Sequence, residues 1–309
     1  MTTAFTWQGR NDTEETGDTS RWHHRVRPFN DQAQGGVALI GFAVDEGVRR
    51  NGGRPGAAQG PQALRSALAN VPVLGEPALW DAGDVIGEGQ SLEDAQSELA
   101  IRVARAMAQG SRPLVLGGGH EVAWGSFQGL MRARPDLQRP LIINLDAHFD
   151  LRQAAQGNSG TPFRQMADWC QAQGRPFHYH VLGISRFANT RALFDRAAHL
   201  GVHHVLDEHL QTADHLAQAQ SDLAQALEQC DGVYLTACLD VLPGTLAPGV
   251  SAPATLGVPL GHVETLIDQI MASGRVLLSD IAELNPSLDE AGRTARVAAR
   301  LAARMARAG

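Results

Sequence analysis

The sequence predicts a three-layer α/β protein, in which a central parallel sheet carries helices on both faces. Short runs of consecutive apolar residues recur along the 309-residue chain, and longer segments of helical period separate them. Strands that are apolar throughout are typical of parallel sheets, because both faces of such a sheet pack against helices. No linker rich in serine or proline and no internal repeat interrupts this alternation. We therefore expect one domain over residues 1–309.

The apolar runs and the segments between them define the expected elements. Pro61 opens a helix over residues 60–69, and Ser91, with Asp94 three residues later, begins a helix that Gly110 ends. The last helix carries a stripe of arginines beside an apolar stripe, which we interpret as a helix docked on the sheet with a solvated face. The predicted strands cover residues 37–42, 113–116, 141–145, 179–182, 233–239 and 275–278. The remaining predicted helices cover residues 122–133, 190–200, 214–229, 262–272 and 293–307.

The bulk composition argues against several classes of protein. The formal net charge is −7, and a surface of that sign does not attract nucleic-acid phosphates. Residues 1–15 lack the apolar core of a secretory signal, and no apolar run approaches the roughly 20 residues of a membrane span. Three widely spaced cysteines, Cys170, Cys230 and Cys238, do not resemble a disulfide framework and suit a reducing compartment. We expect a soluble, cytoplasmic protein that binds neither nucleic acid nor membranes.

Residue types that ligate metals follow three of the predicted strands, at the edge of a parallel sheet where ligands bind. Asp146, His148 and Asp150 alternate along the chain, and period-2 geometry would point their side chains the same way. Cys238 and Asp240 repeat this spacing. The three segments are Gly-Gly-Gly-His120-Glu after residue 116, Asp146-Ala-His148-Phe-Asp150 after residue 145, and Cys238-Leu-Asp240.

These six candidates indicate a metal site rather than isolated polar residues. Each one alone has a simpler interpretation: a loop histidine, a hydrogen-bonded surface pair, or a small buried cysteine. Ionisable groups that converge at three strand ends are desolvated at high cost unless a cation holds them. Aspartate oxygens and histidine nitrogens suit Mn²⁺, Zn²⁺ or Fe²⁺. Six ligands are enough for two metals that share some of them.

The same motifs resemble those of the ureohydrolases, the family of arginase, agmatinase and formimidoylglutamase. The resemblance rests on GGGHE, on DAHFD and on a strand ending in x-D, and it covers nearly the whole chain. It implies an arginase-like fold and a pair of Mn²⁺ ions bridged by hydroxide. The implied metal ligands are His120, Asp146, His148, Asp150 and Asp240, with Cys238 in the sixth ligand position.

Further blocks are similar to the formimidoylglutamase subgroup. They include residues 9–15, 41–61, 158–165, 248–253 and 282–301. The resemblance implies hydrolysis of N-formimidoyl-L-glutamate to L-glutamate and formamide, a step of histidine degradation. It also implies a small-molecule amidine as substrate and a homo-oligomeric assembly, since relatives commonly form trimers or hexamers.

The family pattern also implies roles for individual residues. Asp150 matches the position that passes a proton from water to the leaving amine, and Glu283 matches the carboxylate that binds the amidinium end of the substrate. The two substrate carboxylates need cationic or amide partners. Our candidates for these partners are Arg54, Arg152, Asn158, Ser159 and Thr161.

Two positions depart from the family pattern. Family members usually carry aspartate at the position of Cys238, where the carboxylate helps to hold both metals. A thiolate is a poorer bridge for Mn²⁺, whereas Zn²⁺ or Fe²⁺ accepts it. We therefore expect Cys238 to remain a ligand but to weaken the binding of one metal or to change which metal is bound there. Phe163 occupies the position of the arginase shuttle histidine, so proton transfer takes another route.

Two alternatives remain at this stage. An agmatinase or guanidinobutyrase would use the same site and release urea instead of formamide. A non-catalytic binding protein of the same fold is the second alternative, and Cys238 is the feature that favours it. The other five ligand positions and Glu283 argue for an enzyme, because so many charges are costly to retain without a metal.

Overall fold

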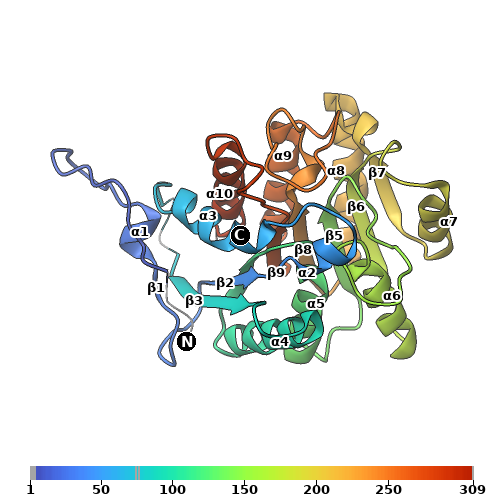
Figure 1. Cartoon of the computed structure of the whole chain (residues 1–309), viewed down its shortest axis with the longest axis horizontal. Coiled ribbons are helices and arrows are strands. Elements are labelled where there is room, and N and C mark those ends of the chain that lie inside the picture. Colours follow the sequence, from blue (N-terminus) through green and yellow to red (C-terminus); the bar gives the residue numbers. More distant parts are fainter. Residues whose placement is uncertain (1–4, 74, 76, 308–309) are drawn as a thin grey trace.

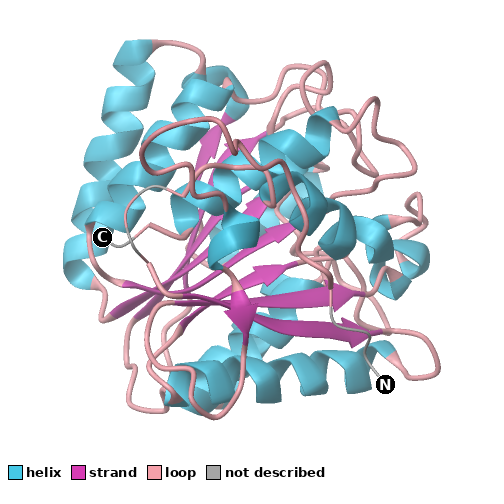
Figure 2. Ribbon diagram, turned by 90° about the vertical axis from the view of Figure 1, so that its left-hand side faces the viewer, coloured by secondary structure: helices cyan, strands magenta, loops and turns pink. Residues whose placement is uncertain are grey.

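A sheet of nine parallel strands lies between two layers of helices in a computed structural model that describes residues 5–73, 75 and 77–307 (Figures 1 and 2). The strand order is β1-β3-β2-β4-β9-β8-β5-β6-β7. The described strands are β1 (Arg27–Pro28), β2 (Val37–Ala43), β3 (Leu79–Ile86), β4 (Arg112–Leu116), β5 (Pro140–Leu145), β6 (His178–Ile184), β7 (His203–Leu206), β8 (Gly232–Cys238) and β9 (Val276–Ala282). The expected three-layer α/β architecture is confirmed.

Each face of the sheet buries its own apolar cluster. On β2, Val37 and Leu39 belong to one cluster, whereas Ala38 and Ile40 belong to the other, as alternating side chains require. The first cluster is covered by α3 (Gly60–Leu68), α8 (Ala213–Gln229), α9 (Leu260–Ala272) and α10 (Arg293–Met305). The second is covered by α4 (Leu92–Ala108), α5 (Val122–Ala133), α6 (Pro162–Ala172) and α7 (Arg191–His199).

The six predicted strands and seven predicted helices all exist, with small shifts at their ends. Ser91 caps α4 as expected, since its hydroxyl accepts a hydrogen bond from the Asp94 amide at 3.1 Å. The basic stripe of α10 is less solvated than predicted, because Arg300 and Arg304 pair with Glu264 of α9. In the described part of the chain, no helix is long and apolar enough to cross a membrane.

Three strands and three helices were not predicted. Strand β3 carries Asp81 and Asp84, which break its apolar pattern, and both pair with Arg65 of α3, whose side chain is fully buried. Strand β7 begins with two histidines and has only four residues. Helix α6 starts at Pro162, a helix-opening signal. The short helices α1 (Trp22–Arg25) and α2 (Glu46–Arg50) carry no comparable pattern.

Candidate metal centre

All six predicted ligands lie at the carboxyl edge of the sheet, after three of its four central strands. His120 follows β4, the group from Asp146 to Asp150 follows β5, and Cys238 ends β8. The strand order β4-β9-β8-β5 places these ends side by side, with β9 between them. Residues more than 100 positions apart in the sequence therefore meet because the strands are parallel and share this edge.

The ligand atoms form two groups that share Asp146. In the first group, His120 Nδ1 lies 2.9 Å from Asp146 Oδ2 and 3.0 Å from Asp150 Oδ2. In the second group, His148 Nδ1 lies 3.1 Å from Asp240 Oδ2 and 3.5 Å from Asp146 Oδ1. Ligand atoms of His120, Asp146 and Cys238 lie within 4.8 Å of one another, and so do those of Asp146, His148 and Asp240. Two ligand sets joined by one carboxylate suit two neighbouring cations.

The predicted reason for this convergence is wrong. Strand β5 ends at Leu145, so the side chains that follow do not alternate as strand residues do. Asp150 has a φ of 47°, in the left-handed region, and Asp240 lies in the 3₁₀ helix η3 (Leu239–Val241). A tight turn gathers the ligands instead, in which Asp146 Oδ1 accepts a hydrogen bond from the His148 amide at 2.7 Å.

Glycines bring His120 close to the other ligands. A Cβ on Gly118 would lie 1.8 Å from the carbonyl oxygen of Val44. A Cβ on Gly119 would lie 2.1 Å from Glu121 Oε2. Only glycine therefore lets the loop after β4 pass this close to the end of β2.

The charges around these atoms fit divalent cations. Asp146, Asp240, Glu283 and Cys238 are all buried. Burial opposes the charge of His120, but Asp146 and Asp150 outweigh it and raise the pKa of His120 well above its usual value. Burial and the carboxylates of Asp146, Asp240 and Glu283 raise the pKa of the Cys238 thiol. Carboxylates that raise both pKa values stabilise positive charge at this position, and a bound cation supplies it.

Thr236 contacts His120, and Asp280 lies beside Thr236 on the neighbouring strand. The sequence analysis did not single out either residue. His120 Nε2 lies 3.1 Å from Thr236 Oγ1. Thr236 is the register partner of Asp280 on the neighbouring strand, and the hydroxyl of Tyr234 donates to Asp280 Oδ2 at 2.5 Å. When Nε2 donates its proton to Thr236, Nδ1, on the side of Asp146 and Asp150, is the nitrogen whose lone pair would bind a metal. The polar residues Thr236 and Asp280 within apolar strands were the available signal.

Glu283 lies at the end of β9, where its side chain is buried and its φ is 72°. Its Oε1 accepts a hydrogen bond from the His120 amide at 2.8 Å. Burial and the charges of Glu121 and Asp240 raise the pKa of Glu283 to about 8. A second cation close to this carboxylate would keep it ionised.

The predicted substrate-binding residues lie on loops around this edge. Arg54 Nε and one of its terminal nitrogens donate to the backbone oxygens of Ser251 and Val250, each at 2.8 Å. The Arg152 side chain is exposed and lies beside Gly160. Of the two arginines, Arg152 therefore has the freer cationic group.

The buried turn after Arg152 contains the three predicted polar residues. Asn158, Ser159 and Thr161 are all buried. Thr161 Oγ1 accepts from the Asn158 amide at 2.9 Å and donates to the Asn158 carbonyl at 3.0 Å. Ser159 Oγ accepts a hydrogen bond from Asn51 at 3.0 Å. These contacts hold the turn in shape and tie it to the glycine-rich loop that carries Arg54.

Phe163 lies in the first turn of α6 and is buried against His120, with ring centroids 5.3 Å apart in an edge-to-face contact. This ring has no proton to exchange. It shields one side of His120 from water, in keeping with the expectation that proton transfer follows another route.

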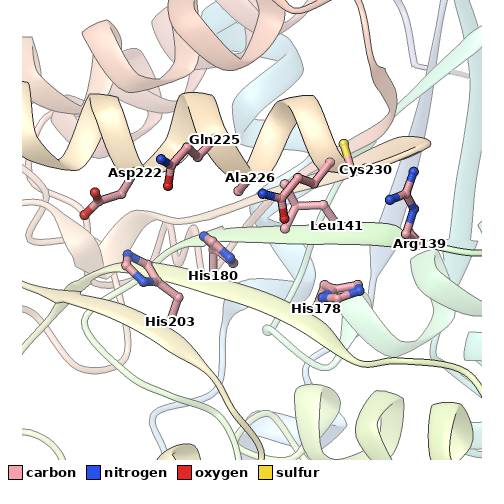
Figure 3. Close-up of a pocket in the computed structure, with 10 residues that line it drawn as sticks. Arg139, Leu141, His178, His180, His203, Asp222, Gln225, Ala226 and Cys230 are labelled. Carbon is pink, nitrogen blue, oxygen red and sulfur yellow. The ribbon is translucent and has the colours of Figure 1, made fainter.

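Two cavities differ in their relation to these residues. A cavity of about 640 Å³ is lined by His148 and by the loops after β6 and η3, so it opens directly beside the ligand cluster. A cavity of about 360 Å³ lies between α8 and the amino ends of β5, β6 and β7, and Figure 3 shows its histidines His178, His180 and His203. The second cavity contains none of the predicted site residues and faces the other end of the sheet.

Comparisons with known proteins give the same assignment. The model of the arginase family matches residues 35–307. The chain is 54% identical over 299 residues to a formimidoylglutamase of Aeromonas hydrophila, covering 96% of this chain and 95% of that protein. It is 51% identical over 305 residues to a formimidoylglutamase of Ralstonia nicotianae, covering 97% and 94%.

Solved structures agree in fold. The formimidoylglutamase from Bacillus subtilis matches with a TM-score of 0.82 at 22% identity, over 96% of this chain and 95% of that one. The Trypanosoma cruzi formiminoglutamase with Mn²⁺ matches with a TM-score of 0.76 at 27% identity, over 90% of this chain and 95% of that one. With a family model that spans most of its length and relatives above 50% identity, the chain belongs to the arginase family.

Proposed function

We propose that this protein hydrolyses N-formimidoyl-L-glutamate to L-glutamate and formamide. The observation that carries the proposal is the combination of a shared-ligand cluster at the sheet edge with relatives named formimidoylglutamase at 51% and 54% identity. We also infer that residues 1–309 act as one ureohydrolase domain. The protein works as a homo-oligomer on a small-molecule substrate.

His120, Asp146, Asp150 and Cys238 would hold one cation, and His148, Asp146, Asp240 and Cys238 would hold the other. The likeness to a Mn²⁺-bound relative favours two Mn²⁺ ions, while the thiol of Cys238 favours Zn²⁺ or Fe²⁺ in one of the two positions. When bound, such ions lower the pKa of water toward about 7 and stabilise the negative charge that develops during attack.

Asp150 moves the proton in this reaction. Water adds to the formimidoyl carbon, and the bond from that carbon to the glutamate nitrogen breaks. The carboxylate of Asp150, 3.0 Å from His120 Nδ1, accepts a proton from the water and delivers it to the departing nitrogen. From the amidinium form of the substrate, the second proton of the water also ends on the departing nitrogen. The products are then formamide and glutamate with its amino group as ammonium, so atoms and charge balance.

Glu283 orients the substrate, and the surrounding loops recognise its tail. The buried carboxylate of Glu283 lies opposite the position of a cationic amidinium and accepts hydrogen bonds from it. Arg152 contacts a substrate carboxylate through its exposed guanidinium, and Arg54 assists from the facing loop. Asn158, Ser159 and Thr161 hold these loops and offer amide and hydroxyl donors.

The test is a product assay with the purified protein supplied in turn with Mn²⁺, Zn²⁺ and Fe²⁺. We expect formamide and glutamate from N-formimidoyl-L-glutamate, and no urea from arginine, agmatine or guanidinobutyrate. Release of urea would assign the protein to the guanidino-hydrolysing members of the family. Absence of turnover of every one of these substrates with all three metals would favour the non-catalytic alternative.

A further inference from the structure

Phe187 is the most exposed large apolar side chain among the described residues, at 94% exposure. It lies in the loop between β6 and α7, at the same sheet edge as the metal ligands. Phe187 and His148 line the same cavity of about 640 Å³. An unpacked phenyl ring beside a metal ligand has apolar surface available for a bound ligand.

The loop that carries Phe187 is fixed to the ligand-bearing turn. The amide of Ser185 donates to the carbonyl of Ala147 at 3.0 Å. Asn189 donates to the same carbonyl at 2.8 Å and accepts from the amide of Phe149 at 3.1 Å. Three hydrogen bonds therefore fix the two ends of the short segment that carries Phe187 beside the turn that carries His148.

Another part of the cavity wall is mostly apolar. It is formed by residues 252–256, among them Pro253 and Leu256, and Leu256 is 44% exposed. Two acidic residues line the cavity, and each already has an ion-pair or hydrogen-bond partner in the protein. Glu208 pairs with Arg186 at 3.4 Å, and the buried Asp207 accepts a hydrogen bond from the Glu208 amide at 2.8 Å. The space between Phe187 and Leu256 suits a hydrocarbon segment better than a charged one.

We propose that Phe187 packs against the two side-chain methylenes of the substrate's glutamate moiety and so selects for its length. This inference rests on the proposed function, in which the formimidoyl carbon lies at the metal ligands and the glutamate carbons extend outward past His148. Phe187 contacts the methylenes of the substrate and not the reacting carbon. It therefore contributes equally to substrate binding in the ground state and in the transition state.

The test compares Phe187→Ala with the wild type on two substrates. On N-formimidoyl-L-glutamate, KM rises about tenfold and kcat changes by less than twofold, because an apolar contact of this size is lost without disturbing the chemistry. On N-formimidoylglycine, which lacks the two methylenes and the γ-carboxylate beyond them, the substitution changes kcat/KM by less than about twofold. Phe187→Leu recovers most of the lost affinity. Ile101→Ala, at an exposed apolar residue of α4, leaves both substrates unaffected.

Three results would overturn the inference. An unchanged KM for N-formimidoyl-L-glutamate in Phe187→Ala would show that the ring does not touch the methylenes of the substrate. Equal losses on both substrates would show a structural role. A change in oligomer mass by light scattering with unchanged kinetics would show that Phe187 belongs to a subunit interface. A wild type that releases no formamide would instead overturn the proposed function, and this inference with it.

Discussion

Cys238 lies in the ligand group of His120 and Asp146, at a position where the family resemblance led us to expect aspartate. A carboxylate offers two oxygens to two cations, whereas a thiolate offers one soft sulfur. Without a cation the thiol stays protonated, because burial and three carboxylates raise its pKa. Binding of a metal must therefore displace this proton, which weakens the affinity for a hard ion such as Mn²⁺.

The corresponding prediction concerns Cys238→Asp. We expect its affinity for the second Mn²⁺ to rise roughly tenfold, with a weaker preference for Zn²⁺ over Mn²⁺. Calorimetric titration with Mn²⁺ and with Zn²⁺ measures both affinities. Cys230→Ser, at a buried thiol at the amino end of β8, serves as the control. Two tightly bound Mn²⁺ ions in the wild type, with the sulfur uncoordinated, would refute this account of Cys238.

Thr236 is expected to act through His120 rather than on the substrate. Thr236→Ala removes the partner of His120 Nε2, so the ring loses its fixed tautomer and metal affinity falls about 10- to 100-fold. Thr236→Ser keeps the hydroxyl and should keep wild-type affinity within about threefold. Equal metal affinity in the alanine variant, measured by equilibrium dialysis, would show that Asp146 and Asp150 orient His120 without help.

The candidate metal ligands can be recognised in the sequence more easily than the residues that position them. His120, Asp146, His148 and Asp150 stand out because they interrupt or follow apolar runs in compact motifs. Thr236 and Asp280 become meaningful only through the register of β8 and β9, which pairs residues 44 positions apart. Their polarity within apolar strands was a local signal that they matter, but no local pattern encodes the register, so their place beneath His120 could not be predicted.

Among the elements, β3 shows why some strands were missed. Its aspartates are neither exposed nor unpaired, since Arg65 of α3 contacts Asp81 at 2.9 Å and Asp84 at 2.5 Å. The ionic contact replaces the apolar packing that identifies the other strands. Runs of apolar residues therefore identified β2, β4, β5, β6, β8 and β9, but not a strand held by a buried charge.

Removing this charge should destabilise the fold strongly. Arg65→Ala leaves two aspartates near the sheet without a partner, and we expect a loss of about 3–5 kcal/mol in the free energy of unfolding. Arg102→Ala, which breaks the part-exposed pair with Glu98 on α4, should cost less than about 1 kcal/mol. Urea denaturation measures both. A loss below about 1 kcal/mol in Arg65→Ala would mean that α3 holds β3 by apolar contacts alone.

For the molecule as a whole, the histidine cavity of Figure 3 makes stability depend on pH. Burial and the neighbouring His203 and His178 lower the pKa of His180 to about 4, and Asp222 offsets this only in part. Above pH 6.5, His180 is neutral in both the folded and the unfolded protein. Between pH 6.5 and 4, the unfolded chain binds a proton that the folded chain rejects, so stability falls as the pH falls.

The test is a comparison of the wild type with His180→Gln at pH 7 and pH 5, under the same metal concentration. We expect the wild type to lose about 1–2 kcal/mol more than the variant over this interval. Both proteins carry the same metal ligands, so the difference between them isolates His180. Parallel losses would mean that His180 takes up its proton in the folded state as easily as in the unfolded one.

At the scale of the whole molecule, the parallel sheet brings three strand ends and their candidate metal ligands together. The most direct measurement is an anomalous difference map at the manganese edge, from crystals held in saturating Mn²⁺ so that even the weaker position is filled. Two peaks about 3.5–4 Å apart are expected, one beside His120 and one beside His148, with Asp146 between them. A single peak, or peaks away from these side chains, would contradict the two-cation site on which the proposed reaction depends.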